Sequence, residues 1–299
     1  MSFYFGDKMS KYSGVKLIAL FLIFVFVFAS CSLNFFADET TTRETTMEFM
    51  TDTNGNRVPV YDDVESAQLD AANFLRDENN RVYYADPLVK TFTGIDVSVF
   101  QGDIDWNKVK ADGIDFVMIR AGFRGYGESG TLNEDARFRE NCKNALAAGL
   151  KVGVYFFSQA ISEQEAAEEA RFVLDIISEY NITYPVAYDW ETIEYDSNAR
   201  TKDMTTSQIT ACANAFCSVI ENAGYETVIY FNRELGYFNY DLSQINNYHF
   251  WLAEYFSVPS FYYDYKIWQY TDKGSVDGIE GAVDINISLV DYSSKGVVG

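Results

Sequence analysis

The stretch Val186-Ala187-Tyr188-Asp189-Trp190-Glu191 places two carboxylates at the end of a short apolar run. Side chains alternate along a β-strand, so Asp189 and Glu191 share one face, while Val186 and Tyr188 share the other. Two acids in one partly dry site do not both ionise easily, so one of them keeps its proton to a higher pH. Ordinary loop or helix-cap acids are the alternative, but the spacing at a strand end favours acid–base chemistry.

Similar apolar runs recur from Gly94 onward and alternate with helix-like segments. This alternation predicts an α/β fold in which parallel strands form a barrel with helices outside. The gaps after Ala253 and Tyr270 are too short for full crossover helices, so the last third of the barrel loses its helices. The eight predicted strands are Gly94–Val99, Phe116–Ala121, Val152–Phe157, Val186–Trp190, Thr227–Phe231, Phe250–Ala253, Lys266–Tyr270 and Ala282–Ile285.

Three of the predicted helices carry clear start or stop signals. Residues 133–150 place apolar side chains, Cys142 among them, on one face and have Gly149 near the end. Ser162 and Thr205 each stand three residues before a Glu or Gln, which is the pattern of a capping box. We therefore expect further helices over residues 162–180 and from 205 to just before 224.

Barrels of parallel strands carry their chemistry at the carboxyl ends of the strands. Asp96 and Asp284 belong to two other predicted strands and join Asp189 and Glu191 as candidate acids. Arg120 ends the second strand, where it either contacts substrate or pairs with these acids, which would also make it structural. The other candidates for substrate contact either line a sugar cleft or fill the barrel, and they are Tyr155, Tyr188, Trp251, Tyr255, Trp268 and Gln269.

The N-terminus has the pattern of an export signal. Three lysines precede an apolar run, residues 17–29, which is short for a membrane span and typical of a signal-peptide core. The run ends in Phe28-Ala29-Ser30-Cys31, which resembles a lipobox and predicts lipidation of Cys31, although Leu is usual at the position of Phe28. Ordinary cleavage or an uncleaved anchor are the alternatives. All three predict an extracytoplasmic protein, membrane-anchored or secreted.

The segments that follow Cys31 differ in composition. Residues 37–46 are polar and predict a flexible tether over residues 32–49, and residues 50–91 predict a small N-terminal extension. Within the extension, residues 54–58 and 78–82 form a weak duplication of turns that open short strands, and residues 64–75 have helical apolar spacing. The predicted boundaries are therefore 1–31 for the signal peptide, 32–49, 50–91, 92–292 for the barrel and 293–299 for a C-terminal tail.

Composition excludes several classes of function. The formal net charge of -21 argues against binding to nucleic acid, which needs clustered Lys and Arg. The chain has one histidine, His249, so a site built on several histidines is excluded. Cys142, Cys212 and Cys217 fit neither a zinc site nor a disulfide framework and are expected to be small buried side chains. No metal and no cofactor is expected, and carboxylates remain as the acid–base groups.

Taken in order, these motifs resemble glycoside hydrolase family 25, the Chalaropsis-type lysozymes. The resemblance covers about residues 92–291. The motifs that carry it are Gly94-Ile95-Asp96-Val97-Ser98, Gln101-Gly102, Ile104-Asp105-Trp106, the strands that begin at Phe116 and Val152, Tyr188-Asp189-Trp190-Glu191, Trp251-Leu252-Ala253, Trp268-Gln269-Tyr270 and Val283-Asp284-Ile285-Asn286. One departure is Tyr155-Phe156-Phe157, where the family often has Tyr-His-Phe.

The resemblance implies an irregular TIM-like (β/α)5(β)3 barrel and N-acetylmuramidase activity, which cuts the β-1,4 bond from N-acetylmuramic acid to N-acetylglucosamine. It implies that Glu191 is the general acid and that Asp189 is its partner, orienting the substrate's N-acetyl group. Asp96 and Asp284 would complete the site. The partners expected are peptidoglycan glycan strands and the membrane, and the chain is expected to be a monomer.

Two other functions compete with this one. A hydrolase of chitin-like polymers, or another hexosaminidase, shares the Asp-x-Glu ending, although the chitinase pattern has a longer acidic run before it. A non-catalytic glycan-binding lipoprotein is the third alternative. Retention of all four acids weighs against it, because binding alone does not require them.

Overall fold

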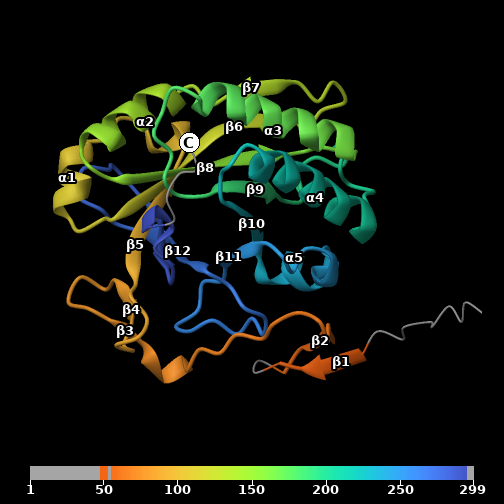
Figure 1. Ribbon diagram of the computed structural model, residues 1–299, viewed down its shortest axis with the longest axis horizontal. Coiled ribbons are helices and arrows are strands. Elements are labelled where there is room, and N and C mark those ends of the chain that lie inside the picture. The colour runs from red at the N-terminus through yellow and green to blue at the C-terminus, as the bar shows by residue number, and fades with distance from the viewer. Residues whose placement is uncertain (1–47, 53–54, 295–299) are drawn as a thin grey trace, which may run out of the picture. The chain divides into compact units, whose positions relative to one another are not determined.

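A closed barrel of eight strands forms the centre of the protein in the computed structural model, which describes residues 48–52 and 55–294 (Figure 1). Each strand pairs with the next, and the pairing of β5 with β6 closes the ring. All eight predicted strands are present. They are β5 Phe92–Val97, β6 Phe116–Arg124, β8 Lys151–Ser158, β9 Val186–Trp190, β10 Thr227–Asn232, β11 His249–Ala253, β12 Ile267–Gly274 and β13 Val283–Ser288.

Helices follow the first strands and are absent from the later connections in the described part of the chain. They are α1 Trp106–Ala111, α2 Phe138–Ala147, α3 Glu163–Ile177, α4 Thr206–Asn222 and α5 Arg233–Phe238. The predicted starts of α3 and α4 are confirmed, because the side chains of Ser162 and Thr205 accept hydrogen bonds from the backbone of the first turn. The helix expected from residue 133 begins only at Phe138, since β7 Leu132–Glu134 first pairs with the end of β6.

The last strand runs in the opposite direction to the others. β5 to β12 pair in parallel around the barrel, whereas β13 is antiparallel to both β12 and β5. The start of β13 therefore lies beside the carboxyl end of β5, and Asp284 is the register partner of Asp96. This reversal brings an acid from the beginning of a strand to the mouth of the barrel.

Aromatic side chains fill the interior of the barrel below that mouth. The buried interior cluster includes Phe92, Phe116, Tyr184 and Tyr292, and the rings of Phe116 and Tyr184 stack with centroids 4.5 Å apart. Gly94 makes room for this packing, because a Cβ atom there would lie 2.2 Å from the ring of Phe116. Packed side chains thus close the barrel below its mouth.

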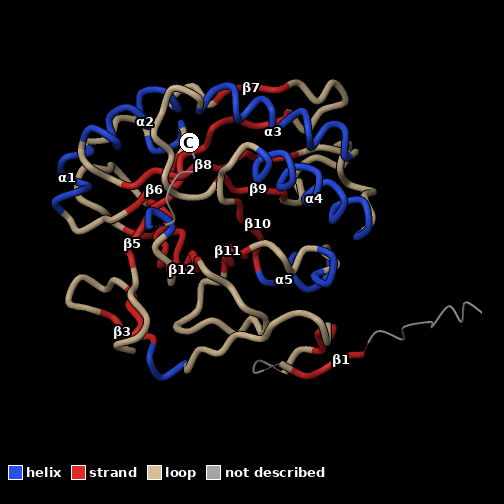
Figure 2. The backbone as a smooth tube through the Cα atoms, in the orientation of Figure 1, coloured by secondary structure: helices blue, strands red, loops and turns tan. Residues whose placement is uncertain are grey.

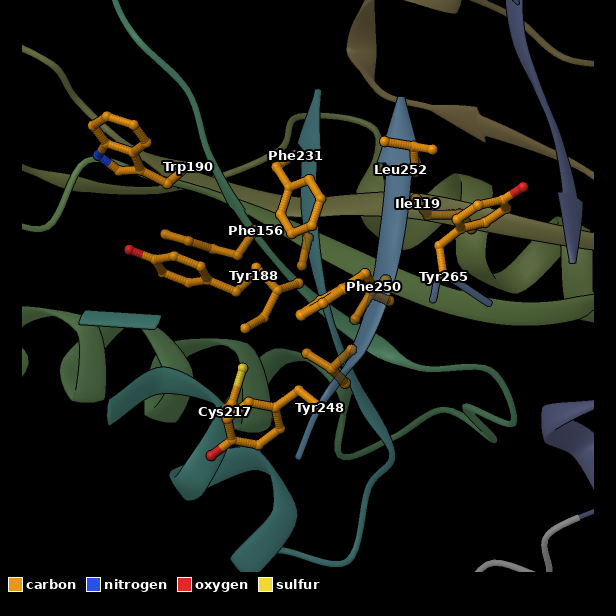
Figure 3. Packing of buried hydrophobic residues seen from close by; sticks show 14 of the residues in the cluster. Ile119, Phe156, Tyr188, Trp190, Cys217, Phe231, Tyr248, Phe250, Leu252 and Tyr265 are labelled. Atoms are coloured by element: carbon orange, nitrogen blue, oxygen red, sulfur yellow. The ribbon is translucent and has the colours of Figure 1, made fainter. Parts of the chain in front are cut away.

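A second layer of the core lies between the strands and the helices. Figure 3 shows Tyr188 of β9 beside Phe156 and Phe231 of the neighbouring strands, with Cys217 of α4 below them. Cys142, Cys212 and Cys217 are buried and free, as expected. The alternation predicted for β9 is confirmed, since Val186 and Tyr188 face this helical layer.

The extension packs along the side of the barrel where helices are missing (Figures 1 and 2). Its two hairpins are β1 Glu48–Thr51 with β2 Arg57–Val60, and β3 Phe74–Arg76 with β4 Val82–Tyr84, so both predicted turns do open short strands. The helix expected over residues 64–75 is wrong. That segment is extended, with a single 3-10 turn at Ala71–Asn73. Val64 and Phe74 pack on the hydrophobic core, whereas Leu75 is exposed, so the apolar residues do not form one helical face.

Several contacts attach the extension to the barrel. Ser66 forms a β-bridge with Tyr263, whose hydroxyl group donates a hydrogen bond to the carbonyl of Pro59. The ring of Phe74 packs edge-on against Trp268 of β12, with centroids 5.2 Å apart. The extension and the barrel, over the described residues from Glu48 to Ser294, accordingly form one compact unit.

The predictions for the N-terminus fall outside the described residues. These are the signal peptide, Cys31 and most of the tether. β1 already begins at Glu48, slightly before the expected start of the extension at residue 50. Among the residues that are described, no helix is both long and apolar enough to cross a membrane.

Candidate active site

A cavity of about 250 Å³ opens at the carboxyl ends of the parallel strands. It contains all four predicted acids and four of the seven residues predicted to contact substrate. The residues that line it are Asp96, Tyr155, Asp189, Glu191, Tyr230, Trp251, Tyr255, Gln269 and Asp284. Residues from seven different strands or strand ends therefore meet at one point, as expected for a barrel.

Asp96 is held by two side-chain amides. Its Oδ2 atom accepts hydrogen bonds from Nδ2 of Asn286 at 2.7 Å and from Nε2 of Gln269 at 2.9 Å. The oxygens of these amides are engaged in turn by Trp251 Nε1, which donates to Asn286 at 2.8 Å, and by the Tyr255 hydroxyl, which donates to Gln269 at 2.8 Å. An indole N–H only donates, so the amide of Asn286 must present its nitrogen to Asp96.

Burial raises the pKa values of all four acids. For Asp96 the pKa rises to about 6, because desolvation outweighs the two amide hydrogen bonds that lower it. The pKa of Asp189 lies well above its usual range through burial and the charges of Glu191 and Asp96, with Arg120 opposing. The pKa of Glu191 is raised by burial and by the charge of Asp284. At least one acid of the group is therefore protonated near neutral pH and able to donate.

Replacing Asn286 by Leu is expected to raise the pKa of Asp96 above 6 by about one unit, because one donor to the ionised form is lost. An NMR titration of the Asp96 carboxyl carbon measures this directly. Trp251→Phe is the matched control, since it removes the bond that orients Asn286 but keeps the donor, and a smaller rise is expected. An unchanged pKa in Asn286→Leu would contradict the role given to this amide.

Asp189 and Glu191 are positioned differently. Asp189 is 5% exposed, and its Oδ1 atom has no hydrogen-bond partner among the described residues. Glu191 lies just beyond β9, and its backbone carbonyl accepts a hydrogen bond from Nε2 of Gln159 at 3.0 Å. Gln159 is fully buried, and its Oε1 atom accepts from the Thr201 hydroxyl at 2.7 Å. Gln159 thus fixes the backbone at Glu191, while the Glu191 carboxyl group remains on the cavity wall.

Asp284 has a pKa of about 8, raised by burial and by the charges of Asp96 and Asp272. The pKa of Asp284 is higher in the folded state than its value of 3.8 in the unfolded chain. The contribution of this group to stability is therefore fully present below pH 3.8 and is lost as the pH rises through about 8. Asp284→Asn should therefore raise Tm at pH 8.5 by about 3 °C, the shift expected for about 1 kcal/mol in a chain of this size. Scanning calorimetry at pH 8.5 and pH 4 tests this. The gain should vanish at pH 4, and an equal gain at both values would contradict it.

Arg120 does not line the cavity. Its guanidinium group pairs with Asp135, at 2.8 Å from Nε and 2.7 Å from Nη2 to Oδ2, and the same oxygen accepts the backbone N–H of Val99. The positive charge of Arg120 opposes the rise in the pKa values of Asp189 and Tyr155 that burial causes. Of the two roles that the sequence left open for Arg120, the structural pairing is the one observed.

Tyr188 and Trp268 were predicted to contact substrate, but neither lines the cavity. Both are fully buried and face away from the cavity. The Tyr188 ring packs on Phe216 of α4, and its hydroxyl is 3.2 Å from Ser158 Oγ. Trp268 lies under the extension, and its Nε1 atom donates to the carbonyl of Glu254. The reason is strand alternation, because each of these residues adjoins one that points inward.

Two site residues were not predicted. Tyr230 lines the cavity, and its hydroxyl donates to Gln269 Oε1 at 3.2 Å. Asn286 lies directly behind Asp96 and is fully buried. Both carried a signal in the sequence, since Tyr230 is near the end of a predicted strand and Asn286 is two residues beyond Asp284, on the same strand face. In the described part of the chain, no group of three or more His, Cys, Asp or Glu residues is arranged to hold a metal ion.

Comparison with known proteins identifies the family. A sequence model described as glycosyl hydrolases family 25 matches residues 95–279. The chain belongs to glycosyl hydrolase family 25. The four acids of the cavity, together with Gln269, come from within this matched region or, for Asp284, from just beyond it.

Three proteins that are similar to this chain are informative. The autolytic lysozyme of Clostridium acetobutylicum is 29% identical over 194 residues, which cover 64% of this chain and 54% of that protein. Lysozyme M1 of Streptomyces globisporus is 30% identical over 218 residues, covering 64% and 66%. The structure of the modular autolysin LytC from Streptococcus pneumoniae aligns with a TM-score of 0.59 at 25% identity, covering 80% of this chain and 56% of that one. The chain thus spans between about half and two thirds of the length of these proteins.

Proposed function

We propose that this protein is a lysozyme-type muramidase, which hydrolyses the β-1,4 bond between N-acetylmuramic acid and N-acetylglucosamine in bacterial peptidoglycan. The observation that carries the proposal is the cavity that gathers Asp96, Asp189, Glu191 and Asp284 in a chain of family 25. The relatives named as lysozymes and an autolysin support the same activity. The order of five β/α units followed by three strands supports the (β/α)5(β)3 description of the barrel.

In this proposal Glu191 is the general acid that protonates the glycosidic oxygen as the bond to the sugar breaks. Its raised pKa supports the role, because the proton must be present at the start of the reaction. Asp189 orients the N-acetyl group of the substrate, and its unpartnered Oδ1 atom supports a contact with the amide N–H of that group. Asp96 and Asp284 are the other two acids of the proposed site. The remaining lining residues, Tyr155, Tyr230, Trp251, Tyr255 and Gln269, form the walls of the sugar site.

Analysis of the new chain ends tests the bond specificity. Purified peptidoglycan is digested, the new reducing ends are reduced with borohydride, and the products are separated and identified by mass. Reduced muramic acid is the expected product. Reduced glucosamine would overturn the proposal in favour of a glucosaminidase, and binding without any new ends would favour a non-catalytic glycan-binding protein.

We also propose that the enzyme acts outside the cytoplasm as a monomer held at the membrane. The proposed parts are a lipoprotein signal over residues 1–31, a tether over 32–49, an extension over 50–91, a barrel over 92–292 and a tail over 293–299. The support is the sequence before residue 32, with Cys31 as the lipidated residue. Mass spectrometry of the N-terminal peptide from membrane-associated protein checks it, and an unmodified Cys31 would contradict lipidation.

A further inference from the structure

Two exposed tyrosines stand together outside the cavity, on two different connections at its end of the barrel. Tyr126 follows β6 and Tyr195 follows β9. They are 39% and 76% exposed, and their ring centroids lie 5.6 Å apart at an angle of 89°. Most aromatic side chains of the barrel are buried, so this pair, here called the tyrosine pair, forms a distinct aromatic surface open to solvent.

Arg200 holds the two connections together. Its backbone N–H donates to the carbonyl of Tyr126 at 3.0 Å, and its guanidinium group donates to Glu165 Oε1 at 2.7 Å and to the carbonyl of Gln159 at 3.3 Å. The side chain of Arg200 is only 8% exposed, so these bonds are shielded from solvent. The backbone at Tyr126 is therefore held in place before any ligand binds, which reduces the entropy cost of binding there.

The same anchor connects the tyrosine pair to the catalytic acid. Gln159, whose carbonyl accepts from Arg200, donates through its side chain to the carbonyl of Glu191. Tyr195 lies four residues after Glu191 on the same connection, and the charge of Glu191 contributes to raising the pKa of Tyr195. Tyr126 is thus joined through Arg200 and Gln159 to the backbone of Glu191 on the cavity wall.

The size of the cavity indicates that a polymer substrate must extend beyond it. Its volume of about 250 Å³ lies below the range of about 300–1,000 Å³ that is usual for pockets that enclose a small ligand. A glycan strand whose scissile bond lies beside Glu191 therefore continues over the surrounding surface. The side chains of Glu128 and Glu194 are exposed on the same two connections, which disfavours the lactyl carboxylate of N-acetylmuramic acid but carries no penalty for the neutral N-acetylglucosamine units of the strand.

We propose that the tyrosine pair is an outer glycan-binding subsite, which binds a further sugar of the peptidoglycan strand beyond those in the cavity. The apolar face of a pyranose ring packs on an aromatic ring, and the tyrosine hydroxyls supply hydrogen bonds to the sugar's polar groups. The inference rests on the proposed muramidase function. It adds that the enzyme prefers long strands to short ones.

Kinetics on peptide-free glycan strands of different length test the subsite. The measured quantity is the ratio of kcat/KM on long strands to kcat/KM on the shortest oligosaccharide that the wild type cleaves. In the double variant Tyr126→Ala, Tyr195→Ala this ratio should fall about tenfold, the size expected from losing aromatic contact surface. The double variant Tyr126→Phe, Tyr195→Phe keeps the rings and should retain most of the ratio. Tyr83→Ala removes a tyrosine that is equally exposed, at 39%, on the β3–β4 hairpin, and should leave the ratio unchanged.

The outcomes separate the subsite from the function on which it rests. An unchanged ratio in the alanine double variant overturns the subsite. An equal loss on long and short substrates also overturns it, because the damage then lies at the cavity. If the wild type cleaves neither substrate, the muramidase function falls and the subsite falls with it. If the wild type cleaves both and the alanine variant keeps its ratio, the subsite alone is wrong.

Discussion

Glu191→Gln is expected to lower turnover on peptidoglycan by at least about a hundredfold, the lower range for loss of a general acid. The amide has the shape of the protonated acid but does not release a proton to the leaving oxygen. The backbone at this position is held by Gln159 through the Glu191 carbonyl, so the substitution leaves the connection in place. Turnover is measured as reducing ends released per unit time at saturating substrate, and a Tm that does not fall shows that the fold is intact.

A matched control lies on the same connection. Glu194→Gln makes the same chemical change at an exposed side chain that does not line the cavity, and turnover should stay within about twofold of wild type, as is usual for surface substitutions. The wild-type rate should also fall as the pH rises through the raised pKa of Glu191, because the required proton is then lost. Wild-type turnover in Glu191→Gln would remove this residue from the mechanism.

The barrel and its acids could be predicted because the relevant signals are local. Short apolar runs mark the strands, and the spacing of Asp189 and Glu191 puts both on one strand face. The direction of β13 could not be predicted, because it depends on which strand edges remain free when the ring closes. Asp284 reaches the site only through that reversal, as its pairing with Asp96 shows.

Alternation explains the two errors among the predicted aromatic contacts. Asp189 and Gln269 point into the cavity, so their direct neighbours Tyr188 and Trp268 must point outward. Applied to every strand, the same rule selects Tyr230, which lines the cavity and was missed. The helix predicted in the extension was wrong for another reason. The conformation of residues 64–75 is set by contacts with barrel residues that are far away in the sequence, such as the bridge from Ser66 to Tyr263.

Arg124→Met is expected to lower the free energy of unfolding by about 3–5 kcal/mol, the usual cost of leaving one member of a buried ion pair behind. Arg124 is 4% exposed and Glu169 is fully buried. Their Nε and Oε1 atoms lie 2.7 Å apart, and the second Glu169 oxygen accepts the Ser158 hydroxyl at 2.6 Å. Arg124 Nη1 also donates to the carbonyl of Gly130 at 2.7 Å. Urea unfolding followed by tryptophan fluorescence measures the loss.

Two further variants separate the buried charge from a general packing effect. Arg139→Met removes an exposed arginine that is paired with Glu134, and should cost far less than Arg124→Met because the pair is screened by solvent. Adding Glu169→Gln to Arg124→Met removes the stranded charge and should recover part of the loss. A loss in Arg124→Met no larger than that of Arg139→Met would contradict the argument.

The loss of stability in Arg124→Met should also depend on pH, and the pKa of Glu169 decides in which direction. Burial raises the pKa of Glu169 to about 7 although Arg124 lowers it, so removing Arg124 raises that pKa further. Glu169 is then protonated at pH 5 and the missing cation matters little, whereas at pH 8 folding must bury an unpaired charge or hold a proton that the unfolded chain releases. The destabilisation should therefore be larger at pH 8 than at pH 5. Because Ser158 bonds to Glu169 and directly precedes Gln159, the same loss should loosen the backbone that holds Glu191.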